Sequence, residues 1–160
     1  MRDTTFSPDM GRLSDPEILV VRTWRKMVFS HGACLSIGEE FDFESRTEVP
    51  HAVGEFLAAL AQGVRHRLTI GHPGCLHVTA DEHQMLALIA ACQNGNTILL
   101  QSHLSWLVRP CRQKPVAEAA HALALTLHMH GLAFQARTPR AQTGRPSLAL
   151  VHERSRASLH

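Results

Sequence analysis

Two helix-start signals constrain the fold of this chain more than any other feature. Ser14 and Thr79 are each followed three positions later by a glutamate, Glu17 and Glu82, which is the spacing of a capping box. A proline in the first turn after Ser14 strengthens the earlier signal. Backbone N–H groups in the first turn have no acceptor within the helix, so the lack of an N–H in proline costs nothing there. Apolar residues follow both signals at helical spacing. We therefore predict one helix that starts at Ser14 and ends before Gly32, and another over residues 79–94.

Three further helices are predicted from proline, asparagine and glycine positions, over residues 50–67, 96–109 and 114–130. In the last of these, Leu125 and Met129 lie on the side opposite the main apolar stripe. A helix that is apolar nearly all round is typical of a central, buried position.

The composition fits one soluble domain that is built mainly from helices. The chain has 160 residues, 44% of them apolar, which is enough for a core of its own. We predict a mostly α, single-domain bundle of about five helices over residues 14–136. A flexible N-terminus (1–13) precedes it, and a basic, mobile tail (137–160) follows. A short C-terminal β-hairpin is the alternative for residues 132–160.

The sequence predicts a cytoplasmic protein. Its apolar runs are shorter than the ~18–20 residues of a membrane span, and its polar N-terminus does not resemble a secretory signal. Four cysteines are irregularly spaced, at positions 34, 75, 92 and 111. We expect them to be reduced. Cys92 lies on the apolar stripe of its helix and is expected to pack in the core. Cys111 lies between Arg109 and Arg112 and is a candidate redox thiol.

The segment from His66 to His83 has the residues of a metal site. His72 and Cys75 enclose Pro73-Gly74, a turn dipeptide that would direct both side chains toward one point, and His77 follows closely. The predicted ligands are His72, Cys75 and His77, with His66 and His83 as further donors. His103 is a more distant candidate. Zinc is the expected ion, and iron, copper and nickel are alternatives.

Three classes of function follow from these features. The first is a small regulatory or adaptor protein with a structural or sensory metal, which binds a protein partner or itself through helix surfaces. The second is a small metal-dependent hydrolase, in which Glu82 would act as a base near a metal-bound water. Classical catalytic signatures are missing from the sequence, so we expect a binding protein rather than an enzyme.

The third class is a DNA-binding regulator of the winged-helix type. From residue 137 onward the chain has five arginines and one glutamate, and Arg137, Arg140 and Arg145 would contact phosphates from a wing. The helix over residues 114–130 offers mostly Ala and Leu, which argues against its use as a recognition helix. A second basic cluster (Arg22, Arg25 and Lys26) lies off the apolar stripe of its helix. We expect it to form a solvated face, with phosphate contact as the alternative.

Overall fold

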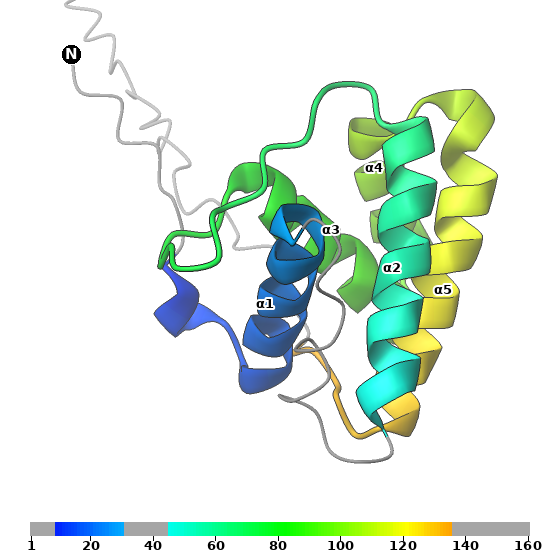
Figure 1. Cartoon of the computed structure of the whole chain (residues 1–160). Helices are drawn as coiled ribbons and strands as arrows, with labels where there is room; N and C mark the ends of the chain where they lie inside the picture. Colours follow the sequence, from blue (N-terminus) through cyan, green and yellow to red (C-terminus); the bar gives the residue numbers. More distant parts are fainter. Residues whose placement is uncertain (1–8, 31–44, 136–160) are drawn as a thin grey trace, which may run out of the picture.

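A computed structural model describes residues 9–30 and 45–135, which form a bundle of five α-helices (Figure 1). They are α1 (Asp15–Phe29), α2 (Ser45–Gly63), α3 (Ala80–Gln93), α4 (Thr97–Leu107) and α5 (Gln113–Met129), with 3-10 helices η1 (Met10–Arg12) before α1 and η3 (Pro110–Arg112) before α5. Within the described residues, β pairing is limited to two isolated bridges. The predicted mostly α class is confirmed, and the predicted hairpin lies outside the described residues.

Both capping boxes are present and start their helices as predicted. The Glu17 carboxylate accepts a hydrogen bond from the backbone N–H of Ser14 at 2.8 Å. The Thr79 hydroxyl accepts one from the backbone N–H of Glu82 at 3.1 Å. At the other end of α3 the chain turns at Gly95, whose φ of +64° is a conformation that glycine adopts without strain.

Helix α2 differs from its prediction at both ends. It begins at Ser45 rather than at Pro50, and the extra turn places the buried side chain of Val49 in the core. It ends at Gly63 because the next residues pair with the chain that follows α4. The backbone N–H of Arg65 donates to the Leu107 carbonyl at 3.0 Å. The ends of α2 and α4 are thereby joined.

Helix α5 packs along α2 and against α3 and α4, at the edge of the bundle (Figure 1). Its buried stripe joins a single apolar core, which also includes Trp24 of α1 and Phe56 of α2. The predicted central, buried position of α5 is found for one side of the helix and is wrong for the opposite side. Leu125 and Met129 are 61% and 72% exposed, because one side of α5 has no helix against it among the described residues.

Residues 9–13, just before α1, belong to the fold, which corrects the predicted flexibility for this part of residues 1–13; residues 1–8 lie outside the described residues. Met10 and Leu13 are buried, and the Met10 backbone N–H donates to the Leu76 carbonyl at 2.8 Å. The first helix of the core is therefore held at its N-terminal side by the loop that precedes α3.

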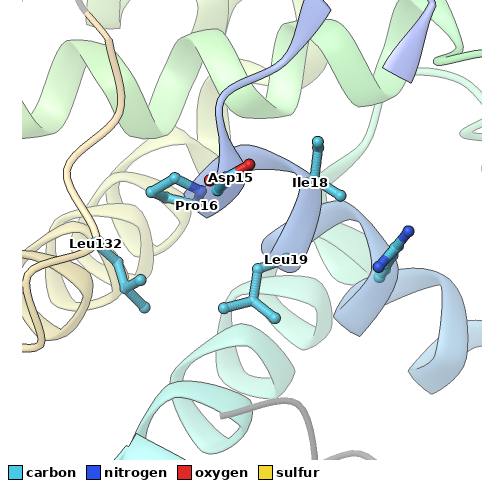
Figure 2. A pocket seen from close by; sticks show the side chains of 6 residues that line it. Asp15, Pro16, Ile18, Leu19 and Leu132 are labelled. Atoms are coloured by element: carbon cyan, nitrogen blue, oxygen red, sulfur yellow. The ribbon is translucent and has the colours of Figure 1, made fainter. Parts of the chain in front are cut away.

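A cleft of about 520 Å³ lies between the start of α1 and the chain that follows α5 (Figure 2). Pro16, Ile18, Leu19 and Leu132 give it a largely apolar lining. In the part of the chain that the structure describes, no helix has the length and apolar character needed to cross a membrane.

Candidate functional site

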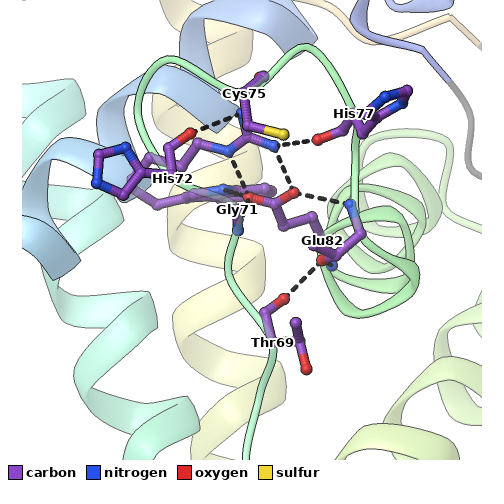
Figure 3. A network of polar contacts seen from close by, with 9 residues as sticks. Thr69, Gly71, His72, Cys75, His77 and Glu82 are labelled. Atoms are coloured by element: carbon purple, nitrogen blue, oxygen red, sulfur yellow. Dashed lines mark hydrogen bonds and ion pairs between the residues drawn. The ribbon is translucent and has the colours of Figure 1, made fainter.

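The histidine-rich segment between α2 and α3 is folded around the guanidinium of Arg25 (Figure 3). Arg25 Nε and Nη2 each donate to a carboxylate oxygen of Glu82 at 2.7 Å. Nη2 also donates to the His77 carbonyl at 2.7 Å, and Nη1 donates to the carbonyls of Cys75 at 2.6 Å and His72 at 3.4 Å. A guanidinium has five N–H groups, so each has an acceptor. The predicted solvated position of Arg25 is wrong, because this loop covers it completely.

Glu82 is the anionic half of the same network. Besides Arg25, its carboxylate accepts hydrogen bonds from the backbone N–H groups of Thr79 (2.9 Å) and Gly71 (3.1 Å) and from Trp24 Nε1 (3.3 Å). Burial alone would raise the pKa of this carboxyl, but the Arg25 and backbone hydrogen bonds outweigh it, and the pKa is lowered. The hydrogen bond with Glu82 raises the pKa of Arg25. Both groups are therefore charged at neutral pH.

Three of the predicted metal ligands contribute backbone carbonyls to this network rather than side chains. The turn between His72 and Cys75 forms as predicted, with the Cys75 N–H donating to the His72 carbonyl at 2.9 Å. The His72 ring packs on Phe29, with centroids 5.1 Å apart, and lies on the opposite side of the network from the His77 ring (Figure 3). No group of three or more His, Cys, Asp or Glu residues that could hold an ion occurs within the described ranges. Zinc binding stays a prediction.

The remaining predicted ligands have other partners in the structure. His66 Nε2 lies 3.0 Å from the Asp81 carboxylate at the start of α3. His83, in the first turn of α3, is half-buried. His103 Nδ1 is 2.6 Å from a glutamine side chain of α3, and burial lowers the pKa of this histidine.

Two other chemical candidates are also placed. Glu82, the proposed base of a hydrolase, is fully buried and bonded to Arg25, so it has no access to a substrate. Cys111 is exposed, as a redox thiol requires. Cys92 packs against the core, as predicted, and burial raises the pKa of its thiol to about 11.

A second group of cations lies where α2 and α4 end and α5 begins, and sequence reasoning did not single it out. The isolated bridge between Val64 and Val108 brings the two segments together. Arg65 Nε donates to the Val108 carbonyl at 3.1 Å, and Arg109 Nη2 donates to the Gln62 carbonyl at 3.1 Å, so one N–H of each guanidinium is held by the backbone. We name five exposed side chains the basic end: Arg65, Arg67, Arg109, Arg112 and Lys114.

The charges of the basic end are not neutralised within the described part of the chain. None of its five side chains forms an ion pair there. Two carboxylates lie near residues of the basic end, either in the sequence or in space. Glu118 is one turn beyond Lys114, and Asp81 is buried and bonded to His66 and to the backbone N–H of Thr69. The result is a positively charged surface at one end of the bundle.

An exposed aromatic residue borders this surface. Trp106, in the last turn of α4, is 46% exposed. Its ring meets the His66 ring edge to face, with centroids 5.3 Å apart and planes at 83°. His66 lies between Arg65 and Arg67 in the chain, so the aromatic pair adjoins the basic end.

Comparison with known proteins gives no assignment: no protein-family model, curated protein or solved structure matches this chain. The geometry of the described residues is therefore the basis for a functional proposal. The arginines predicted to contact phosphates (Arg137, Arg140 and Arg145) lie outside the described residues.

Proposed function

We propose that this chain is a small nucleic-acid-binding protein whose basic end contacts the phosphate backbone. The observation that carries the proposal is the grouping of five exposed cations without an ion-pair partner among the described residues. Arginines that are buried or paired with a carboxylate stabilise the fold, whereas exposed ones without a carboxylate partner leave their charge for an external anion.

The chemistry of the cluster favours phosphate as that anion. Four of its five members are arginines, whose planar guanidinium matches two phosphate oxygens at once. The N-terminus of α5 lies within the cluster and adds the positive end of the helix dipole. Lys114 is in its first turn, and Glu118, one turn later, is the only acidic residue of α5.

The other functions predicted from the sequence have less support in the structure. A metal-dependent hydrolase would need Glu82 in contact with a metal-bound water, and this carboxylate is fully buried against Arg25. A metal-stabilised regulatory or adaptor protein stays a prediction, since the loop that would hold the ion is closed by Arg25. A regulatory role is compatible with nucleic-acid binding.

Fluorescence anisotropy with labelled oligonucleotides tests the proposal. The double variant Arg67→Glu/Lys114→Glu reverses two charges whose side chains have no hydrogen-bond partner within the described residues, so the fold is expected to persist. We expect its affinity to fall at least about tenfold at low salt. Arg22→Glu, an exposed reversal on α1, is the control and is expected to have a smaller effect. Equal affinities for the double variant and the wild type would contradict the proposal.

A polyanion control separates nucleic acid from acidic protein as the partner. Poly-glutamate carries dense negative charge but no phosphates, so it should compete with the oligonucleotide weakly. Displacement of the oligonucleotide at equal charge concentration would overturn the assignment to nucleic acid and favour an acidic protein segment.

A further inference from the structure

We infer that Trp106 and His66 form a stacking platform that makes the basic end selective for single-stranded nucleic acid. This inference rests on the proposed function and adds the form of the ligand. Bases in a duplex are already stacked on each other, whereas the bases of a single strand are free to stack on an aromatic side chain. A basic surface with an aromatic residue at its border is the combination that single-strand-binding proteins use.

Hydrogen bonds through Asp81 hold His66, one of the two residues of the platform, in place. His66 Nε2 is 3.0 Å from Asp81 Oδ1, and the other oxygen of Asp81 accepts from the backbone N–H of Thr69 at 2.7 Å. Asp81 itself is fixed in the first turn of α3. The His66 ring therefore has a defined orientation, and its edge-to-face contact at 5.3 Å orients the Trp106 ring.

The position of the platform suits a strand that runs across the basic end. Arg65 and Arg67 flank His66 in the chain, and the Leu107 carbonyl next to Trp106 accepts a hydrogen bond from the Arg65 backbone N–H. A base on the tryptophan would thus have its own phosphate, or the neighbouring one, within reach of the arginines. The exposed 46% of Trp106 provides the contact surface.

The fluorescence of Trp106 provides a direct test. The chain has two tryptophans, and Trp24 is fully buried with its indole N–H bonded to Glu82. We expect oligo(dT) to quench the exposed tryptophan of the wild-type protein, and the quenching to disappear in Trp106→Phe. Binding without any quenching would contradict stacking on this residue.

The affinity series tests selectivity. Trp106→Ala is expected to weaken oligo(dT) binding about 5-fold to 100-fold, with Trp106→Phe in between because it keeps a ring. A duplex of equal length should bind the wild type and Trp106→Ala equally. Ile98→Ala, a truncation of an apolar residue that is 81% exposed at the other end of α4, is the control and should leave binding unchanged.

The failure of this inference is distinguishable from the failure of the proposed function. If Arg67→Glu/Lys114→Glu loses affinity but Trp106→Ala does not, the basic end binds nucleic acid and the platform is overturned. If neither variant changes binding, both are overturned. If Trp106→Ala melts at a lower temperature than wild type, the folded Trp106→Phe variant carries the test, and unchanged affinity and quenching in it would overturn the platform.

Discussion

Arg25 and the arginines of the basic end occupy contrasting environments. Arg25 is fully buried, and each of its N–H groups has an acceptor in Glu82 or in the loop between α2 and α3. The arginines of the basic end are exposed, and within the described residues none is paired with a carboxylate. The same side chain thus organises a loop in one place and leaves its charge available to a ligand in the other.

A buried, paired charge stabilises the fold, whereas an exposed, unpaired one can bind a ligand. Substitution of the buried arginine should change stability, because a buried partner loses its counter-ion. Substitution of Arg67 or Lys114 in the basic end should change binding and leave stability nearly constant, because solvent already screens those charges.

Arg25→Ala is expected to lower the free energy of unfolding by about 3–5 kcal/mol, because it leaves the Glu82 carboxylate buried without its partner. Urea denaturation followed by circular dichroism measures the change. Arg22→Ala, an exposed truncation on the same helix, should stay within about 0.5 kcal/mol of wild type. Equal effects of the two substitutions would show that Arg25 does not hold the loop.

Acid should destabilise the protein through Glu82. The pKa of this carboxyl is lowered from 4.5 in the folded state, so its contribution to stability is complete above pH 4.5 and is lost as the pH falls through the folded pKa. The raised pKa of Arg25 has no effect in this range. Glu82→Gln should be less stable at neutral pH and show a flatter pH dependence below 4.5. An unaltered acid profile in this variant would contradict the assignment.

Two glycines of the same loop should respond differently to alanine. A Cβ on Gly71 would overlap the Arg25 guanidinium, whereas a Cβ on Gly74 meets no atom within 4 Å. We expect Gly71→Ala to cost about 1–3 kcal/mol in stability and Gly74→Ala about zero. Thermal melting of the two variants measures this difference. A lower melting temperature for Gly74→Ala than for Gly71→Ala would mean that the loop does not approach Arg25 as closely as described.

The smallest effect is expected from the predicted zinc ligands. Because Arg25 already closes the loop, chelator treatment, His72→Ala and Cys75→Ser should each change stability by less than about 1 kcal/mol. Elemental analysis alongside the melting curves checks this. Stoichiometric zinc that is lost in both variants, with a large fall in melting temperature, would restore the metal site as the organising feature.

The helices could be predicted from the sequence because their signals are local. The capping boxes at Ser14 and Thr79 and the glycine after α3 each lie within a few residues of the helix end that they define. The start of α2 was missed, since Pro50 looks like a first-turn proline and the burial of Val49 is a tertiary effect. The local pattern predicts that α2 begins at Pro50, whereas the packing of Val49 in the core extends the helix to Ser45.

The candidate sites could be predicted only in part because they are assembled over long sequence separations. The segment from His66 to His83 is predicted to hold a metal ion, but in the structure it surrounds the guanidinium of Arg25, which comes from α1 at a position that helical periodicity assigns to solvent. In the basic end, the segment around Arg65 and the segment around Arg109 are joined by a backbone bridge that no sequence pattern predicts. The sequence shows that each of the two short segments contains cations, but it does not show that the two segments lie close together.

The salt dependence of oligo(dT) binding shows whether phosphates are bound at the basic end or at the tail. Arg67→Gln/Lys114→Gln and the tail variant Arg137→Gln/Arg140→Gln remove equal charge. If the basic end contacts phosphates, the slope of log K against log salt should fall by about 1.4 in the first variant, at about 0.7 for each lost phosphate contact. A slope equal to wild type in the first variant, with a reduced slope in the tail variant, would contradict the account and place binding in the tail.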